Sequence, residues 1–354
     1  MLNYGYNLIK LLFGHRHLKP RLGIYYVTAQ CNFNCTYCED FGRPRNLSTE
    51  DAYLPQPLAG AQRILAVLRQ GVDCLMLTGG EPLLYPHLLP LVTYARRELR
   101  FRQITLTTNG WLLPQAEGLL PLLDRLIISL DAADPEKWSG IIRTPLAAQA
   151  VLENIERYAA RQKKDRFRLI INAVLTPQTL PEGPALLDFC ARHKILISFS
   201  PQAVCNWPRY DLVTHPGYRP FITHVMAVKR RGGPVLGSMA YWKTLLNLQP
   251  YSCYPTLTPR VLPNGDLTYP CRPIEKSGHS HGGRPCNLRE VSSWQEARQA
   301  AARQYGPPPR VCSSCFQQCF AESSLMQAQP LSLLKELILY SPSRQADLST
   351  YAPG

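Results

Sequence analysis

Three cysteines near the start of the chain, Cys31, Cys35 and Cys38, stand in the segment CNFNCTYC. A cubane iron–sulfur cluster takes four thiolate ligands, one for each iron, and this segment supplies three of them. The fourth iron is then open to a small ligand. Zinc is the alternative metal, but structural zinc sites use CxxC knuckles and close all four positions with protein ligands. The spacing therefore favours an iron–sulfur cluster with one open position.

Short β-branched runs alternate with stretches of helical period between residues 22 and 200. Six strands, each followed by a helical or loop segment, predict an α/β fold in which parallel βα units form a partial (β/α)6 barrel of the TIM type. The predicted strands are residues 23–28, 74–78, 103–108, 125–130, 168–175 and 195–200, and the predicted helices lie near 57–69, 86–99, 147–162 and 183–193.

Chemistry-bearing segments fall where the predicted strands end. CNFNCTYC follows the first strand, GGEP (79–82) the second, TNG the third and SLD the fourth. In a sheet of βα units, functional residues gather at the carboxyl ends of the strands. The positions of the motifs therefore agree with the predicted architecture, which is stronger support than any single motif.

CNFNCTYC, with the aromatic Tyr37 just before its third cysteine, resembles the CxxxCxΦC signature of radical S-adenosylmethionine (SAM) enzymes. GGEP resembles the second motif of the same family, and the resemblance covers about residues 22–200. It implies that the three cysteines hold a catalytic [4Fe–4S] cluster, that SAM fills the open position, and that reductive cleavage of SAM releases a 5′-deoxyadenosyl radical.

The same resemblance implies residues that contact SAM. Gly79, Gly80 and Glu81 would meet its amino group, since glycines let the backbone approach a ligand and a carboxylate accepts hydrogen bonds from an ammonium. Arg143, in GIIRTP, stands where many members have an arginine that pairs with the SAM carboxylate. The further implied cofactor-binding residues are Tyr37, Asn109, Ser129 and Asp131. The alternative for Asn109, Ser129, Asp131 and Arg143 is that they are ordinary turn residues at strand ends.

A second group of cysteines occupies the last third of the chain. A hairpin signal, Asn264-Gly265 in RVLPNGDLTYPC, lies between the first two of them. With a later CxxC, the group resembles the Twitch or SPASM extensions of radical SAM enzymes. The resemblance implies one auxiliary [4Fe–4S] cluster, and the expected ligands are Cys253, Cys271, Cys312 and Cys315, with Cys319 the main competitor for a place.

A structural zinc ribbon is the alternative for this second group, because two hairpin cysteines plus a CxxC is also zinc-like spacing. Cys286, together with His279 and His281 in SGHSHGGRPC, is expected in a flexible loop and is a weaker candidate ligand. Cys74 and Cys190 stand inside apolar segments and are expected to be core residues.

Composition narrows the class of protein. A chain of 354 residues with 45% hydrophobic residues can bury a sizeable core, which excludes a disordered chain. It has no apolar run of the roughly 18 residues that a membrane span needs and no signal peptide, so a cytoplasmic protein is expected. Short CxxC-type spacings in a reducing compartment then point to metal or iron–sulfur ligands rather than disulfides. The formal net charge of +14 fits either a solvated basic surface or an acidic partner.

The expected organisation has five parts: a basic amphipathic segment (1–21), a radical SAM core (22–205), an irregular connecting region with short helices (206–250), an auxiliary-cluster domain (251–325) and a C-terminal helix and tail (326–354). The first segment has no acidic residue. It combines basic side chains with an apolar cluster and could lie on an anionic membrane or pack on its own domain. The basic residues are Lys10, Arg16, Lys19 and Arg21, and the apolar cluster is Leu8, Ile9, Leu11, Leu12 and Phe13.

The sequence thus predicts a radical SAM enzyme that abstracts hydrogen from an unidentified peptide, small molecule or lipid, with an auxiliary cluster assisting oxidation or bond formation. An electron donor such as flavodoxin or ferredoxin is expected as a partner, peripheral membrane contact is open, and nucleic acid is not expected. The alternative is a non-catalytic iron–sulfur or zinc-binding electron-transfer or adaptor protein with a basic surface. Such a protein would have little use for GGEP and SLD.

Overall fold

The computed structural model of the chain describes residues 2–15, 18–38, 54–204, 207–269, 271, 286–306, 315–330 and 336. The chain forms two compact units, each built from separate segments. Unit 1 comprises Met1–Lys19, Asn172–Leu257 and Pro308–Gly354, and unit 2 comprises Pro20–Ile171 and Thr258–Pro307. Among the described helices, none is both long enough and apolar enough to cross a membrane.

Unit 2 contains most of the strands. Its strands are β1 (Leu22–Thr28), β2 (Cys74–Gly79), β3 (Gln103–Thr108), β4 (Arg125–Ser129), the first half of β5 (Arg168–Leu175), β9 (Arg260–Val261) and β10 (Leu267–Thr268). Its helices are α2 (Leu58–Arg69), α3 (Leu88–Arg97), α4 (Pro135–Ile142), α5 (Pro145–Asp165) and α11 (Trp294–Tyr305).

Strands β1 to β4 pair in parallel and in chain order, as the alternating pattern predicted. Two-residue strands β9 and β10 form the hairpin predicted at Asn264-Gly265, and β9 extends the sheet by pairing parallel to β1. The order in unit 2 is therefore β10-β9-β1-β2-β3-β4, followed by β5. Both faces of a parallel sheet are buried, and Tyr25, Leu77 and Leu106 are accordingly inaccessible to solvent.

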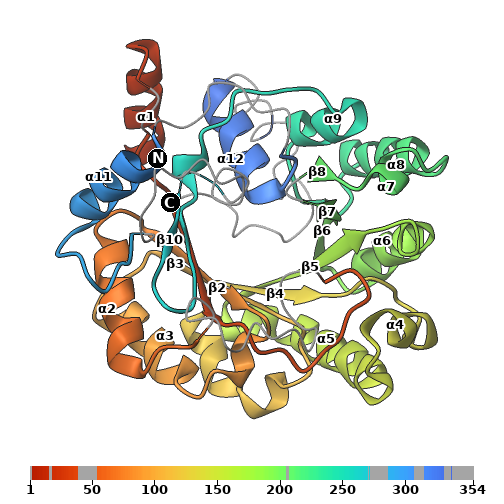
Figure 1. Cartoon of the computed structure of the whole chain (residues 1–354). Helices are drawn as coiled ribbons and strands as arrows, with labels where there is room; N and C mark the ends of the chain where they lie inside the picture. Colours follow the sequence, from red (N-terminus) through yellow and green to blue (C-terminus); the bar gives the residue numbers. More distant parts are fainter. Residues whose placement is uncertain are drawn as a thin grey trace. The chain divides into compact units, whose positions relative to one another are not determined.

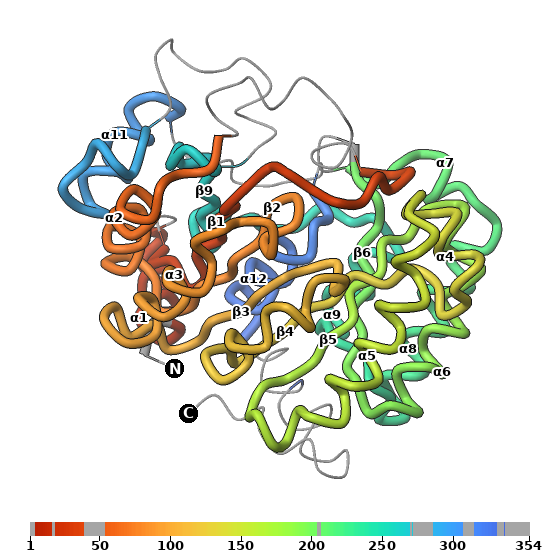
Figure 2. The backbone as a smooth tube through the Cα atoms, turned by 90° about the horizontal axis from the view of Figure 1, so that it is seen from below, coloured from red at the N-terminus to blue at the C-terminus, as the bar shows by residue number. Residues whose placement is uncertain are grey.

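Helices cover one face of these strands (Figures 1 and 2). In α2 the residues spaced for one helix face, Ala61, Ile64, Leu65 and Leu68, are all buried, and α3 repeats the pattern with Leu88, Leu91, Val92 and Ala95. The apolar stripes of these helices thus complete the core that the strands begin. This arrangement confirms the predicted α/β fold with a partial barrel.

Unit 1 is largely helical. Its strands are the second half of β5, which pairs with β6 (Leu196–Pro201), and the short pair β7 (Ala203–Val204) and β8 (Trp207–Pro208). Its helices are α1 (Leu2–Leu12), α6 (Gly183–Arg192), α7 (Tyr210–Val213), α8 (Tyr218–Arg230), α9 (Met239–Asn247) and α12 (Gln318–Ala328). Tyr218 and Tyr241 are fully buried, and their hydroxyls donate to the carbonyls of Leu245 and Phe316 at 3.1 and 3.2 Å.

Two expectations about single elements need correction. Residues 206–250 are more regular than predicted, since α8 is a helix of 13 residues with a buried face of Phe221, Ile222 and Val225. Cys190 is a core residue as expected, but Cys74 begins β2 and is only half-buried. Apart from Glu336, the predicted helix LSLLKELIL lies outside the described residues.

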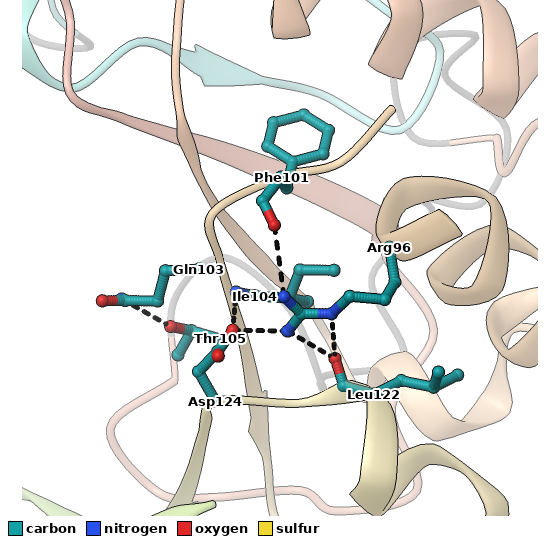
Figure 3. Close-up of polar contacts among 7 residues, drawn as sticks. All are labelled: Arg96, Phe101, Gln103, Ile104, Thr105, Leu122 and Asp124. Carbon is teal, nitrogen blue, oxygen red and sulfur yellow. Dashed lines mark hydrogen bonds and ion pairs between the residues drawn. The ribbon is translucent and has the colours of Figure 1, made fainter. Parts of the chain in front are cut away.

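One arginine ties the end of α3 to the strands beside it (Figure 3). The guanidinium of Arg96 donates to the carbonyls of Leu122 and Phe101 at 2.7 and 3.2 Å, and to the carboxylate of Asp124 at 2.5 Å. Asp124 in turn accepts from the backbone N–H of Ile104 at 2.6 Å. Half-buried hydrogen bonds to charged groups contribute more than neutral ones, so this network holds the start of β3 against the start of β4.

Replacing Arg96→Met should therefore lower the free energy of unfolding by about 2–3 kcal/mol, because Asp124 and two carbonyls lose the charged donor that they share, while Asp124 keeps the N–H of Ile104 as a donor. Arg97→Met is the matched control: Arg97 is the next residue of α3 and is exposed, so a change within about 0.5 kcal/mol is expected. Denaturant unfolding of both variants measures the difference. Equal losses would contradict the role assigned to Arg96.

Candidate functional site

The carboxyl ends of β1 to β4 lie at one edge of the sheet. The register pairs Thr28 with Gly79 at the ends of β1 and β2, and Thr108 with Ile128 near the ends of β3 and β4. The segments that follow these strands are the three-cysteine loop, GGEP, TNG and SLD, in the order the sequence predicted. The four motifs therefore leave the same edge of unit 2.

The three-cysteine loop, residues 29–38, is fastened to the end of α4 (Figure 2). The backbone N–H groups of Asn34 and Thr36 donate to the carbonyls of Ile142 and Ile141 at 3.1 and 3.0 Å. The last carbonyls of a helix lack intrahelical donors, so they are free to accept bonds from a loop. Buried Phe33 adds an apolar anchor, with its ring 6.0 Å from that of Trp111.

Tyr37 makes a second fastening. Its hydroxyl donates to Oδ2 of Asp131 at 2.7 Å, which joins the loop to the segment after β4. Burial and the neighbouring Asp131 hold the pKa of Tyr37 well above its usual value, so the phenol remains a donor. Two residues that the family resemblance assigned to SAM are thus directly bonded to each other.

The side chain of Glu81 is held at this edge by three hydrogen bonds. It is fully buried, and its carboxylate accepts from the N–H of Asn109 at 2.7 Å, the hydroxyl of Thr108 at 2.7 Å and the N–H of Leu83 at 2.9 Å. Burial raises the pKa of Glu81 to about 7, against the hydrogen bonds that lower it. Its side chain therefore joins the end of β2 to the end of β3. Contact with SAM stays a prediction for this residue.

The glycines of GGEP lie so close to the backbone at the end of β1 that there is no room for a side chain. A Cβ on Gly79, which has φ +151°, would lie 2.2 Å from the carbonyl oxygen of Thr28, and one on Gly80 would lie 2.2 Å from that of Gln30. The N–H groups of Gly80 and Glu81 donate to these same oxygens at 2.9 and 2.7 Å. The close approach that the motif allows is thus between GGEP and the start of the three-cysteine loop.

The three cysteines are half-buried, and their thiols lie within electrostatic reach of one another. Burial, with Glu81 and Cys38 nearby, raises the pKa of Cys31 to about 11, and burial with Asp131 and the other two cysteines raises that of Cys35 further. Within the part of the chain that the structure describes, no three His, Cys, Asp or Glu side chains are yet set as ligands around one point. The loop keeps the thiols within electrostatic reach of one another, and a bound cation would relieve the repulsion that opposes thiolate formation.

Asn32, between the first two cysteines, is a residue that the sequence analysis missed. Its Oδ1 accepts from the side-chain amide of Asn109 at 2.6 Å, while its Nδ2 is buried and has no hydrogen-bond partner among the described residues. A buried amide without an acceptor is costly, so an acceptor group of a bound molecule would stabilise it. Three adjacent thiols and an unsatisfied donor fit a bound cluster with a polar ligand.

Two other predicted residues lie close in the chain to these contacts. Ser129 ends β4 and is half-buried, two residues before Asp131. Arg143 is exposed and ends α4 in a left-handed conformation with φ 54°, next to the carbonyl of Ile142 that binds the loop. Their contacts to SAM remain predictions.

The second cysteine group is divided between the units. Cys253 and Cys315 are buried and Cys319 is half-buried in unit 1, whereas Cys271 and Cys286 belong to unit 2. In unit 1, Cys315 and Cys319 both lie within electrostatic reach of Tyr241. Cys312, His279 and His281 lie outside the described residues.

Cys286 does not behave as a loop residue. It is buried, and its carbonyl accepts from the N–H of Leu267 in β10 at 2.7 Å. The N–H of Leu288 likewise donates to the carbonyl of Gly265 at 2.8 Å. The expectation that Cys286 lies in a flexible loop is therefore wrong, because its segment is bonded along the hairpin.

Comparison with known sequences gives a family match. A family model described as the Radical SAM superfamily matches residues 25–203, half of the chain. The curated GTP 3′,8-cyclase of Mycolicibacterium smegmatis is 34% identical over 195 residues, covering 53% of this chain and 52% of that protein. GTP 3′,8-cyclase 2 of Mycobacterium tuberculosis is 38% identical over 167 residues, covering 46% and 45%. The chain thus spans about half the length of the curated relatives it matches.

Comparison with solved structures supports the fold. Streptococcus suis SuiB bound to S-adenosylmethionine has a TM-score of 0.59 and 20% identity, covering 82% of this chain and 68% of that one. The structure described as native anSMEcpe with bound AdoMet also has a TM-score of 0.59, with 16% identity and 81% of each chain covered. At these identities the likeness establishes the shared architecture.

The bond between Tyr37 and Asp131 should govern how firmly the loop is held. Replacing Tyr37→Phe removes a hydrogen bond to a carboxylate, and such bonds contribute about 1.5–3 kcal/mol. Exchange of the loop amides of Asn34 and Thr36 should therefore accelerate by about tenfold or more in hydrogen-exchange experiments. Tyr85→Phe is the control, since it removes a 2.7 Å bond to the carbonyl of Gln56 outside this loop. Unchanged exchange in Tyr37→Phe would show that the bond does not anchor the loop.

Proposed function

The chain belongs to the radical SAM superfamily, and from this premise we propose that it cleaves SAM reductively at a [4Fe–4S] cluster held by Cys31, Cys35 and Cys38. Enzymes of this family use such a cluster and SAM as cofactors. The observation that carries the proposal is the placement of a three-thiol loop, fastened at both its flanks, beside the ends of β1 to β4.

When bound, the reduced cluster would supply the electron that cleaves SAM to methionine and a 5′-deoxyadenosyl radical, which takes hydrogen from the substrate. The residues of this chain would bind the cluster and orient SAM. Three thiolates would leave one iron of the cluster without a protein ligand, and the unsatisfied amide of Asn32 could donate to a polar group of a bound molecule. Gly79, Gly80 and Glu81 would meet the amino group of SAM, and Asn109, Ser129, Asp131 and Arg143 its remaining polar groups.

We propose further that cysteines of the last third of the chain bind one auxiliary [4Fe–4S] cluster, as those of Twitch and SPASM extensions do. The proposed ligands are Cys253, Cys271, Cys312 and Cys315, with Cys319 as the competitor. Buried Cys253 and Cys315 support this, since burial shields a cluster from water. Such a cluster would accept an electron from a substrate radical or bind the substrate.

Family membership does not favour the alternative of a non-catalytic electron-transfer or adaptor protein. A reductant such as flavodoxin or ferredoxin remains part of the proposal, because cleavage of SAM consumes an electron. The domain boundaries predicted from the sequence likewise remain proposals.

The first test removes the three thiols of the loop. Anaerobically reconstituted protein should bind about eight irons, and Cys31→Ala/Cys35→Ala/Cys38→Ala should lose about four of them together with all 5′-deoxyadenosine formation, since each cubane holds four irons. Cys190→Ala, which removes a buried thiol of α6, should keep both. Full iron content in the triple variant would overturn the assignment of this cluster.

A second test separates the auxiliary cluster from cleavage of SAM. Cys271→Ala should abolish product formation while leaving some 5′-deoxyadenosine release, because the thiols of the other cluster are intact. Cys253→Ala should behave in the same way, whereas Cys74→Ala should retain full product formation. Full product yield in either auxiliary variant would remove that cluster from the chemistry.

The names of the relatives suggest a substrate for this chain. The relatives of greatest identity reported above are named for action on GTP, and we propose GTP as the first substrate to test. If it is the substrate, adding GTP to reduced enzyme and SAM should increase 5′-deoxyadenosine release and consume GTP in proportion. ATP serves as the control nucleotide. If GTP is recovered unchanged, the proposal for GTP fails and the peptides, other small molecules and lipids expected from the sequence remain, while the proposal for SAM cleavage stands.

A further inference from the structure

The helix α1 presents two apolar faces, and only one of them packs on the protein. On the inner face, fully buried Asn7 forms two hydrogen bonds with the backbone of Lys19, at 2.9 and 2.7 Å. Leu11 on the same face packs against the cluster of Leu18, Tyr254 and Leu257. The hydroxyl of Tyr4 also donates to the carbonyl of Met326 in α12 at 3.1 Å. The helix is thus fixed to unit 1 along this face.

The outer face carries large apolar side chains in contact with water. Tyr6, Ile9, Leu12 and Phe13 are 51, 56, 78 and 76% exposed. They recur every three or four residues, so they lie on one side of the helix, which we call the outer face. Among the described residues, nine large hydrophobic side chains are exposed, and four of the nine are these. The helix thus packs on its own unit as one alternative expected, but Leu12 and Phe13 take no part in that packing.

The N-terminal part of the chain, residues 1–38, has no acidic residue. The first acidic residue of the chain is Glu39, whereas Lys10, Arg16, Lys19 and Arg21 precede it. Lys10 lies over the ring of Tyr6 at 5.1 Å, so its ammonium borders the outer face. Two copies of such a surface would repel each other. Nucleic acid is also disfavoured as a partner, because exposed apolar side chains do not bind a phosphodiester backbone.

We propose that the outer face of α1 is a membrane-contact surface that inserts Ile9, Leu12 and Phe13 into the headgroup boundary of an anionic bilayer. Aromatic and aliphatic side chains on one face of a helix with basic neighbours are the combination that binds such interfaces. The inner face keeps its contacts with unit 1 in the bound state, so the helix needs no rearrangement to reach the lipid. This surface shares no residue with the proposed SAM site, and the proposal does not depend on that site.

The test is co-sedimentation of the full chain with vesicles. Binding is expected to vesicles of phosphatidylcholine mixed with phosphatidylglycerol, but not to phosphatidylcholine alone, and should weaken about tenfold when salt is raised far enough to shorten the screening length severalfold. The variant Leu12→Glu/Phe13→Glu should lose binding. Leu146→Glu is the matched control, because Leu146 is 86% exposed on α5 of unit 2, and this variant should bind like the parent protein.

Three outcomes would overturn the proposal. Equal recovery in the supernatant with both lipids would do so, and so would equal binding of the Leu12→Glu/Phe13→Glu variant. A protein that ignores vesicles but forms a dimer in analytical ultracentrifugation, lost in that variant, would assign the face to a second protein chain instead. Because the substituted side chains are exposed, 5′-deoxyadenosine release in vesicle-free solution should be unchanged in the variant, which keeps this test independent of the proposed function.

Discussion

The buried carboxylate of Glu81 is the interaction on which the rest of the site depends. Its own N–H is bonded to the carbonyl of Gln30, and its side chain accepts from Thr108 and from the N–H of Asn109. One residue therefore joins the carboxyl ends of β1, β2 and β3. Its folded-state pKa of about 7 lies above the ordinary 4.5, so its ionisation opposes folding as pH rises through that range. The hydrogen bonds limit this cost and fix the edge from which the three-cysteine loop departs.

This edge also explains why the glycines of GGEP and the cysteines of the loop belong together. Side chains at Gly79 and Gly80 would meet the backbone of Thr28 and Gln30. The close approach of GGEP to the backbone after β1 thus fixes the start of the three-cysteine loop. Hydrogen bonds to Asp131 and to the end of α4 fix the path of its remaining residues. A site assembled in this way keeps the three thiols within electrostatic reach of one another.

Much of this architecture was predictable from the sequence. Strands β1 to β6 are short segments rich in β-branched and apolar residues with turn residues at their ends, so their positions followed from the sequence pattern. The hairpin at Asn264-Gly265 followed from its turn residues. The length of helix α8 was underestimated because prolines in this region favoured an irregular segment, although Phe221, Ile222 and Val225 recur at helical spacing. Cys286 was misplaced because glycines and histidines before it indicate a loop, whereas its backbone is bonded to β10.

The contacts within the site were less accessible to sequence reasoning. The family resemblance assigned Tyr37 and Asp131 to the cofactor and did not indicate their hydrogen bond. The two residues are 94 positions apart in the sequence, and their pairing depends on the path of the three-cysteine loop. Asn32 carries no signal beyond its place between two cysteines. The exposure of Leu12 and Phe13 likewise depends on which face of α1 meets unit 1, and a helix with two apolar faces leaves that choice open.

The central claim is that three cysteines hold a cluster with one iron open to SAM. Electron paramagnetic resonance of the reduced Cys253→Ala/Cys271→Ala protein tests it directly, because the proposed auxiliary cluster is then disrupted. The account predicts the signal of a reduced [4Fe–4S] cluster whose shape changes when SAM is added. A signal that is identical with and without SAM would contradict it.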